Sequence, residues 1–499
     1  MVKVLINPQR VIGTRDPMIY GHFLEHFHRQ IYGGIYEPGS PLADEQGMRK
    51  DVMEALRRIS PAIVRWPGGC YVSAYHWKDG VGPERQPAYD KAWRVEESNE
   101  FGTDEFMDFC RKIGAEPYIC TNAGTGTPEE MSDWVEYCNL PNQGKWARAR
   151  IRNGHPEPYG VKYWSIGNEN YLGGEMGSKT VAEWGPFVRE SAKMMHRADP
   201  RIQLLAASTD DLDWNISLLR EAGPYLDWIS IHDYWDPCWQ DNNISPYETC
   251  MAMSLHAGDK IYKIKHILGS LGYLGRIRVA FDEWNLHGWH HPNVDSATEP
   301  FLEPRDKNDL NDSYTMADAV FTGVFLNECL RNCDVVGMAN FAPTVNTRGM
   351  IYTHQDGIVL RPTYFVFELY SRFMGDQVLD TWLPESETFE AVWRGKTVQV
   401  PSLDALAVKD SATGSIRVSI INRHPDKAQT LTLAGLMHEN GAKAVLYTVN
   451  GDGKNAFNDV DHPDDVKIVE KEIGLSGTET SLTVEPHSVN VLVLHEPKN

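Results

Sequence analysis

The sequence predicts an α/β fold, a (β/α)8 TIM barrel plus a C-terminal all-β sandwich. The first observation is a series of eight apolar runs with the make-up of buried strands, separated by helical segments or by gaps of helix length. The second is a change of pattern past about residue 375, where apolar and polar residues alternate as in antiparallel sheets. Eight alternations over about 350 residues fit the size of a barrel, and 499 residues leave room for a second domain.

The eight predicted strands follow one another in a regular series. They begin near residues 18, 62, 116, 162, 202, 227, 277 and 334. Helices are expected at 49–59, at 104–113 after a Thr103 cap, from 127–128 onward, and at 181–197, 247–268 and 312–331. The competing architecture is an open doubly wound sheet, but no Gly-x-Gly-x-x-Gly follows the first strand to favour it.

The chain divides into three predicted parts. Residues 1–14 read as a strand with a turn at Asn7-Pro8, and because this strand has no place in the barrel it is expected to pair with the sandwich. Residues 15–374 form the catalytic barrel and residues 375–499 the β-sandwich. Alternating or apolar runs at 415–420, 431–433, 481–484 and 491–494 supply strands of that second domain.

Composition excludes several classes of partner. The formal net charge is −21 and the pI is near 5.3, which argues against nucleic acid and anionic membranes and fits a neutral ligand. No apolar stretch approaches the roughly 18 residues of a membrane span. Fifteen Trp and 21 Tyr are compatible with sugar binding against aromatic faces, although most such rings belong to the core.

Cysteine usage points to a reducing compartment. The eight Cys are scattered without a Cys-x-x-Cys, and the opening apolar run is too short for a signal peptide, so free thiols in the cytoplasm are expected. His22, His26 and His28 lie close together but lack partners at metal-ligand spacing. We therefore expect no metal and no cofactor.

Two predicted strands each end in an acid. Glu169 follows the apolar run of the fourth strand within Gly167-Asn168-Glu169-Asn170, and Glu283 closes the seventh within Asp282-Glu283-Trp284-Asn285. The carboxyl ends of barrel strands share one face, so two carboxylates are expected at one pocket. Paired carboxylates are the groups that glycoside hydrolysis requires.

The two acids are given different roles. Glu169 has the amide of Asn168 beside it and is followed by a loop, where partial desolvation is expected to raise its pKa as an acid requires. Glu283 is the expected nucleophile. Tyr234 or His232, at the end of the sixth strand, is expected to hydrogen-bond Glu283 and hold it ionised.

Motifs along nearly the whole chain resemble glycoside hydrolase family 51, the α-L-arabinofuranosidases. The motifs are GHFLEH at 21–26, IYGGIYEPG at 31–39, RWPGG at 65–69, YHWKDG at 75–80, NEFGTDEF at 99–106, GNEN at 167–170, DEWN at 282–285 and DGIVLRPT at 356–363. The resemblance implies a retaining double displacement with Glu169 as acid/base and Glu283 as nucleophile. It also implies an assembly of identical subunits, often a hexamer.

The resemblance further implies a set of sugar-binding residues. These are Glu25, Cys70, Trp93, Asn168, His232 and Tyr234. Two positions depart from the family pattern, since Cys70 stands where many members have Asn, and Pro362 where they have Gln. Both positions line the sugar pocket in the family, and the loss of two amides bears on which sugar is accepted.

Other roles remain open for several of these side chains. Glu25 is alternatively a salt-bridge partner of Arg65, and His232 a buried core histidine. Cys70 is a small packed side chain rather than a nucleophile, because no general base accompanies it. Trp77, Trp93 and Trp289 are either sugar platforms or packing residues.

Three functions compete at this point. The first is a cytoplasmic exo-acting hydrolase that releases α-L-arabinofuranosyl residues from arabino-oligosaccharides or arabinoxylan fragments. The second is an endo-acting glycanase on glucan or xylan, with the pocket opened by the changes at Cys70 and Pro362. The third is a carbohydrate-binding protein without catalysis, which the presence of both acids disfavours.

Overall fold

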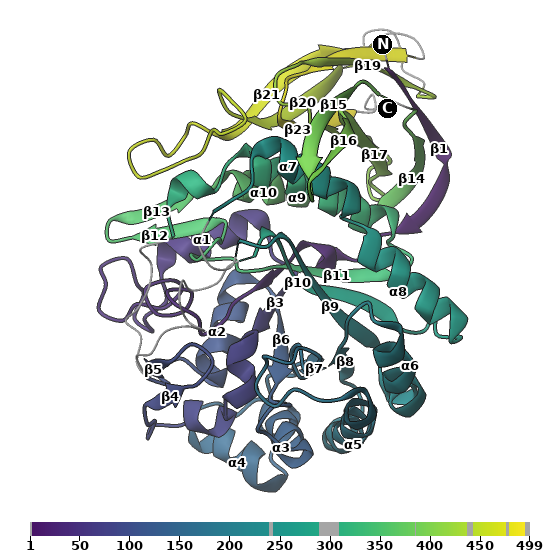
Figure 1. Cartoon of the computed structure of the whole chain (residues 1–499). Helices are drawn as coiled ribbons and strands as arrows, with labels where there is room; N and C mark the ends of the chain where they lie inside the picture. The colour runs from purple at the N-terminus through teal and green to yellow at the C-terminus, as the bar shows by residue number, and fades with distance from the viewer. Residues whose placement is uncertain are drawn as a thin grey trace.

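Eight parallel strands close into a barrel in the computed structural model, which describes residues 2–238, 243–288, 309–384, 386–436, 443–475 and 479–494. The strands follow each other around the ring in chain order, so the predicted (β/α)8 barrel is confirmed and the doubly wound sheet is wrong (Figure 1). They are β2 (Gly21–Phe23), β3 (Ile63–Trp66), β6 (Glu116–Thr121), β7 (Tyr163–Ile166), β8 (Gln203–Ala207), β9 (Trp228–Asp236), β10 (Arg278–His287) and β11 (Val336–Phe341).

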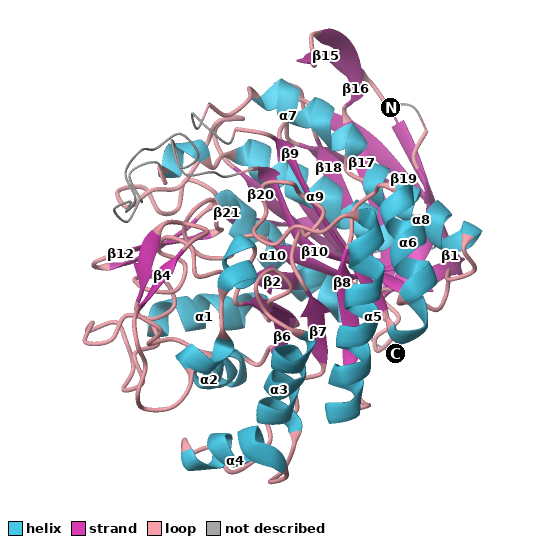
Figure 2. Cartoon of the chain, turned by 60° about the horizontal axis from the view of Figure 1, so that its bottom comes forward, coloured by secondary structure: helices cyan, strands magenta, loops and turns pink. Residues whose placement is uncertain are grey.

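Helices surround this ring, as Figure 2 shows for α2, α3, α5 and α6. Most lie close to their predicted positions. Their bounds are α1 (Lys50–Ile59), α2 (Thr103–Ile113), α3 (Pro128–Asn139), α4 (Gly144–Arg152), α5 (Val181–Ala198), α6 (Leu212–Glu221), α7 (Tyr247–Met253), α8 (Asp259–Ser270), α9 (Met316–Arg331) and α10 (Pro362–Phe373).

Three predicted elements differ from the structure. Thr103 is the first residue of α2 rather than its cap, because the Glu105 carboxylate accepts from the Gly102 N–H at 2.8 Å and closes the helix start itself. The single helix expected at 247–268 is two helices, with a 3-10 turn at Ser254–His256 between them. The first strand begins only at Gly21, because Asp16 caps a 3-10 turn at Pro17–Tyr20.

The barrel interior changes character from one end to the other. Near the amino ends of the strands it is filled by apolar side chains that form one buried cluster: Met18, Ile63, Tyr118, Tyr163, Leu205, Trp228, Ala280 and Met338. Toward the carboxyl ends the inward side chains become polar, with Arg65, Asp282 and Glu283 buried. A packed floor below a polar layer is the usual arrangement of a catalytic barrel.

The C-terminal part is a nine-stranded sheet. In spatial order the strands are β21 (Lys467–Gly474), β20 (Lys443–Asn450), β23 (Ser488–Leu494), β18 (Ile416–Asn422), β17 (Leu403–Lys409), β14 (Gln377–Trp382), β1 (Val2–Thr14), β19 (Gln429–Ala434) and β22 (Glu479–Val484). The predicted sandwich is thus one continuous sheet that folds over itself: Val4 of β1, Leu482 of β22 and Leu492 of β23 share one core.

The leading strand β1 lies inside that sheet. It pairs antiparallel with β14, with Leu5 opposite Trp382, and parallel with β19, with Val2 opposite Leu431. The register shifts after Asn7, at the expected turn. Three hairpins complete the strands: β4 (Ala88–Asp90) with β5 (Val95–Glu97), β12 (Ile351–His354) with β13 (Gly357–Leu360), and β15 (Thr388–Trp393) with β16 (Lys396–Pro401).

Helices α9 and α10 lie between the barrel and the sheet (Figure 1). Tyr370 of α10 is buried there, and its hydroxyl is 2.8 Å from both Asn327 Oδ1 of α9 and Ser419 Oγ of β18. This shared hydrogen bonding ties the two parts of the chain together. None of the helices in the described ranges combines the length and the apolarity needed to cross a membrane.

Candidate active site

Both predicted acids lie at the carboxyl-end face of the barrel. Strand β7 ends at Ile166, and Gly167 (φ 76°) and Glu169 (φ 46°) then turn the chain through the left-handed region. A non-glycine residue in that region is strained by about 1 kcal/mol or more, which is typical of residues held in place for function. Glu283 lies within β10, directly opposite His232 of β9.

The two carboxylates face each other across His232. One oxygen of Glu169, one oxygen of Glu283 and one ring nitrogen of His232 all lie within 4.8 Å of one another. His232 Nδ1 is 2.9 Å from Glu169 Oε1 and 3.5 Å from Glu283 Oε2. The imidazole therefore touches both acids and is not a histidine of the apolar core.

Glu283 is held by two donors. The Tyr234 hydroxyl donates to Oε1 at 2.7 Å, and the Arg65 guanidinium donates to Oε2 at 2.8 Å. Of the two residues expected to bond Glu283, Tyr234 does so directly. Donors on both oxygens stabilise the ionised form of a carboxyl, which is the form that attacks.

A buried ion network supports this layer from below. Arg65 Nε lies 3.4 Å from Asp282 Oδ2, and Asp282 accepts hydrogen bonds from Tyr118 at 2.5 Å and Ser230 at 2.6 Å. Burial would raise the pKa of Asp282, but the charges of Arg65 and His232 lower it overall. Asp282, Tyr118 and Ser230 were not predicted as site residues, because they come from separate strands that only the closed barrel brings together.

The protonation of Glu169 differs from the sequence prediction. Burial does favour the neutral acid, but the hydrogen bond and charge of His232, with Arg65 and Lys260 further away, lower the pKa of Glu169 overall. The expected upward shift is therefore wrong for the unliganded protein. Burial alone would lower the pKa of His232, yet the charge of Glu283 and bonds to Asp282 and Glu169 raise it to about 10.

Glu25 follows β2 and lines the same cavity as the two acids. It accepts from the Tyr71 N–H at 3.0 Å and from Trp93 Nε1 at 3.2 Å, and its ion pair with Arg65, an alternative raised above, does not form. Burial and then the charge of Glu283 raise the pKa of Glu25 well above its usual range. A Cβ at Gly68 would meet the Glu25 side chain at 2.5 Å, which explains the glycine of the RWPGG motif.

Asn168 and Cys70 also reach the site. Asn168 Oδ1 accepts from Arg65 at 2.6 Å, while its buried Nδ2 has no partner within the described part of the chain. Asn168 is not among the described residues that line the active-site cavity, so its expected contact with the sugar stays a prediction. Burial, with the charges of Glu175, Glu169 and Glu25, raises the pKa of the Cys70 thiol well above its usual range. This thiol is therefore not a nucleophile at neutral pH.

A cavity of about 480 Å³ joins these groups. Among the predicted residues it is lined by Glu25, Cys70, Trp93, Glu169, His232, Tyr234 and Glu283. Trp93 packs on Phe27 with ring centroids 3.9 Å apart, so it forms a wall. Tyr171, whose hydroxyl is 3.4 Å from Glu169 Oε1, is a lining residue that sequence reasoning missed.

Three further expectations have different outcomes. Trp77 is buried against Trp134 with near-parallel rings and donates to the Glu130 carbonyl, so it is a core residue. Pro362 begins α10 and is not among the described residues that line the cavity, so its expected place in the pocket is wrong. Trp289 lies outside the described residues.

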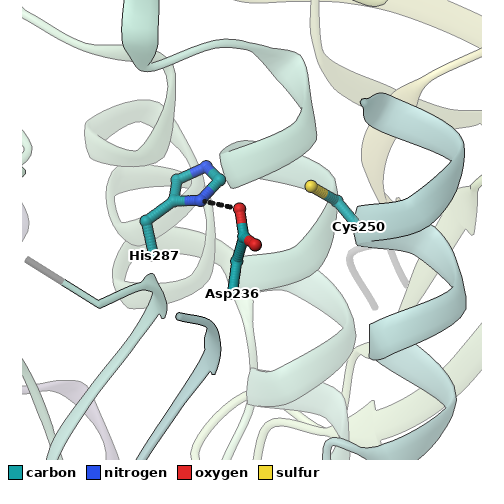
Figure 3. Close-up of side chains that lie close together, drawn as sticks. All are labelled: Asp236, Cys250 and His287. Carbon is teal, nitrogen blue, oxygen red and sulfur yellow. Dashed lines mark hydrogen bonds and ion pairs between the residues drawn. The ribbon is translucent and has the colours of Figure 1, made fainter. Parts of the chain in front are cut away.

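A second buried polar group lies beside the site, with Asp236 at the end of β9, His287 at the end of β10 and Cys250 on α7 (Figure 3). Asp236, Cys250 and His287 each place one possible metal ligand within 4.8 Å of the others. However, His287 Nδ1 is 2.8 Å from Asp236, its Nε2 is 3.3 Å from Asp318, and the Cys250 thiol donates to the Ser245 carbonyl. His287 is therefore an imidazolium between two carboxylates, which ties the ends of β9 and β10 to α9 and leaves its ring nitrogens already bonded.

Comparisons with known proteins agree with this geometry. The family profile described as the α-L-arabinofuranosidase 1 domain matches residues 55–251, and that of the α-L-arabinofuranosidase C-terminal domain matches residues 282–488. An intracellular exo-α-(1→5)-L-arabinofuranosidase of Halalkalibacterium halodurans is 34% identical over 86% of both chains. A probable α-L-arabinofuranosidase C of Aspergillus flavus is 35% identical over 94% of this chain and 93% of its own length.

Solved structures extend the likeness to the whole fold. The α-L-arabinofuranosidase of Thermotoga maritima, in complex with arabinose, superposes with a TM-score of 0.88 at 36% identity, covering 99% of this chain and all of the other. A family 51 α-L-arabinofuranosidase from Bifidobacterium longum gives 0.89 at 27% identity, covering 99% of both chains. With both family profiles and near-complete relatives in agreement, this chain is a glycoside hydrolase and belongs to the family 51 α-L-arabinofuranosidases.

Proposed function

We propose that the protein is a retaining, exo-acting enzyme that releases terminal α-L-arabinofuranosyl residues from arabino-oligosaccharides or arabinoxylan fragments. The observation that carries the retaining mechanism is the spacing of Glu169 and Glu283, whose nearest oxygens lie within 4.8 Å. Retaining glycosidases hold their carboxyl groups about 5 to 5.5 Å apart, whereas inverting ones need roughly 6.5 to 9.5 Å to admit a water.

In the first step Glu283 attacks the anomeric carbon while the bond to the leaving oxygen breaks. Tyr234 and Arg65 hold the attacking carboxylate in position. The leaving oxygen takes its proton from Glu169, so one glycosyl-enzyme ester and one alcohol are formed. Glu25, which lines the cavity, is placed to bind a hydroxyl of the sugar during this step.

In the second step Glu169, now ionised, takes a proton from water, and the water oxygen attacks the anomeric carbon and releases Glu283. His232 links the two steps electrostatically. Forming the ester removes the charge of Glu283, which is a main cause of the raised pKa of His232. The His232 imidazolium then has one carboxylate less to neutralise. Its bond to Glu169 favours the ionised form of Glu169, which is the base that the second step needs.

Exo action and the sugar identity rest on the cavity and the relatives. A cavity of about 480 Å³ encloses the acids and suits one sugar unit with part of its neighbour. Relatives matching nearly the whole chain are named as arabinofuranosidases, one of them as exo-acting. The endo-glycanase and non-catalytic alternatives have no comparable support.

We further propose a cytoplasmic location and a homo-oligomer, with a hexamer as the expected size. The location is supported by eight cysteines that are all free and by a relative named as intracellular. The oligomer is supported by family likeness alone. Sedimentation that shows only a 56.5 kDa monomer at micromolar concentration contradicts the oligomer.

The test of the function compares kcat/KM across a panel of nitrophenyl furanosides and pyranosides. The α-L-arabinofuranoside should exceed every other glycoside, and NMR should detect the product first as the anomer of retained configuration. Product analysis on linear arabino-oligosaccharides should show single arabinose units from the start. Early release of longer fragments, or first formation of the inverted anomer, contradicts the proposal.

A further inference from the structure

The loop after β7 carries a second buried acid, Glu175, which is only 7% exposed. The Ser73 hydroxyl donates to its Oε1 at 2.5 Å, and the Cys70 thiol is its other side-chain partner. Within the described part of the chain no basic side chain forms an ion pair with this carboxyl. A buried carboxyl whose hydrogen-bond partners are only a hydroxyl and a thiol is stabilised far less as an anion than a carboxyl beside a cation.

Glu175 lies beside the expected acid/base. The Cys70 sulfur, one oxygen of Glu169 and one oxygen of Glu175 all fall within 4.8 Å of one another. Two carboxyls that share one site do not both ionise at low cost, because the second negative charge is repelled by the first. The pair therefore titrates together rather than as two independent acids.

The two carboxyls have opposite surroundings. Glu169 has the His232 imidazolium at 2.9 Å, and Glu175 has only Ser73 and Cys70. The first negative charge of the pair is thus placed on Glu169, and the remaining proton on Glu175. Environments that push apart the pKa values of two neighbouring carboxyls give the two groups different roles in proton transfer.

We propose that Glu175 is a third functional carboxyl, which shares one proton with Glu169 across the Cys70 thiol and so keeps Glu169 able to act as an acid at higher pH. The proposal rests on the role of Glu169 as acid/base. When the leaving group departs, Glu175 supplies the proton that Glu169 delivers and becomes ionised. When Glu169 deprotonates water in the second step, the proton returns to Glu175, so none is lost over a turnover.

The Cys70 thiol can bridge the transfer, because its S–H donates to one carboxylate while its sulfur accepts from the other carboxylic acid. Exchange with solvent is provided by a neighbouring hollow of about 530 Å³. This hollow is lined by Glu175 and shares Cys70, Trp93 and Leu172 with the active-site cavity. Glu175 is therefore accessible to protons but sits outside the space of the reacting sugar.

The direction of the pH effect follows from the charges around Glu175. Burial raises the pKa of Glu175 to about 7, against the bonds from Ser73 and Cys70, and the charges of Glu169 and Glu283 add to the rise. Two cations, Lys91 and Arg94, line the same hollow, and neither forms an ion pair with Glu175 among the described residues. As pH rises through about 7, ionisation of Glu175 places a second negative charge beside that of Glu169. Because the two charges repel each other, the loss of the last proton is disfavoured, and the pair retains one proton to higher pH.

The experiment compares pH profiles of kcat/KM for the wild type, Glu175→Gln and the control Glu157→Gln, an exposed acid elsewhere. Each profile is measured with an arabino-disaccharide, whose leaving group needs a proton, and with a dinitrophenyl arabinofuranoside, whose leaving group does not. Glu175→Gln should move the basic limb for the disaccharide to lower pH by about one unit, a loss that approaches tenfold at pH values well above the wild-type midpoint. The dinitrophenyl profile should move much less, and Glu157→Gln should overlay the wild type.

A basic limb that stays in place in Glu175→Gln, or that moves equally with both substrates, overturns the proposal. If Glu175→Gln does not fold, Ser73→Ala serves instead. It keeps the carboxyl but removes a bond that favours its ionised form, so the pKa of Glu175 rises, the pair keeps its proton longer and the basic limb should move to higher pH. No movement, or a movement to lower pH, overturns the idea. If only the proposal for Glu175 is wrong, Glu169→Ala should still react much faster with a dinitrophenyl leaving group than with a sugar leaving group. If the acid/base assignment of Glu169 is wrong, Glu169→Ala should show no such difference between the two leaving groups.

Discussion

His232 Nδ1 lies 2.9 Å from Glu169 Oε1, so the expected acid of the site is held in the resting protein by a cation. The same ring nitrogen is 3.5 Å from Glu283 Oε2, and the opposite nitrogen is 3.3 Å from Asp282. One imidazolium thus balances three carboxylates. The protonation of Glu169 is set by this group together with burial, and the cation prevails because the pKa of Glu169 is lowered overall.

Glu283→Ala should lose nearly all activity on every substrate, by at least about 10⁴-fold in kcat, because no other group can form the glycosyl-enzyme. The measurement is kcat on the nitrophenyl arabinofuranoside and on an arabino-disaccharide. Added azide should restore some turnover and give a glycosyl azide of inverted configuration. Residual activity that depends strongly on the leaving group is the pattern of the acid/base and contradicts the assignment.

Glu169→Ala should separate the two steps. With a dinitrophenyl leaving group the first step needs no proton and should remain fast, while a sugar leaving group should react roughly 10² to 10⁴-fold more slowly. The second step lacks its base, so the glycosyl-enzyme should accumulate and be visible by mass spectrometry. Azide needs no base and should give a glycosyl azide of retained configuration; an inverted azide means that the two roles are exchanged.

His232→Asn should move the basic limb of the kcat/KM profile to higher pH. The charge of His232 lowers the pKa of Glu169, and without it burial dominates and raises that pKa, so the acid form persists to higher pH. The shift should be about one unit or more, with a general loss of rate of roughly 10²-fold. Tyr234→Phe is the matched control, since it removes a bond to Glu283 but keeps the imidazolium. A limb that moves to lower pH contradicts this account.

Arg65→Met should destabilise the fold by about 3 to 5 kcal/mol, because it leaves the buried carboxylates of Asp282 and Glu283 without their shared cation. The measurement is the free energy of unfolding in urea. Arg10→Met is the control, since Arg10 pairs with Asp380 on the surface and should change the free energy by less than about 1 kcal/mol. Equal losses in the two variants contradict a special role for the buried network.

The loss in Arg65→Met should also depend on pH. The pKa of Asp282 is lowered in the folded protein, so its pairing contributes stability above the ordinary Asp range and is lost as pH falls through the lowered pKa. The difference between wild type and Arg65→Met should therefore be full at neutral pH and shrink in strong acid.

The sequence predicts the positions that a single strand defines. Glu169 and Glu283 are predictable because each closes its own apolar run, and a barrel brings such ends to one face. Asp282, Tyr118 and Ser230 come from three strands that meet only when the barrel closes, and no local pattern marks them. The lowered pKa of Glu169 depends on a distance to His232 across the site, which sequence spacing does not encode.

Loops limited the prediction in a different way. Glu175 comes close to Glu169 only through the path of the loop between β7 and α5, whose turns no periodicity describes. The short first strand reflects the cap that Asp16 makes on a 3-10 turn, a local bond that competes with the apolar pattern. Trp77 shows the opposite difficulty, since an aromatic residue in a family motif can equally be core.

Strand β1 makes the first residues of the chain part of its last domain. Residue 14 is synthesised 363 positions before its sheet partner at residue 377 (377 − 14), so this strand waits about 20 to 70 s on a translating ribosome for β14 to emerge. Without β1, the facing edges of β14 and β19 are both bare, and bare edges recruit strands from other molecules. Shortening the chain at its amino end therefore threatens solubility before it threatens the barrel, although all the chemistry lies in the barrel.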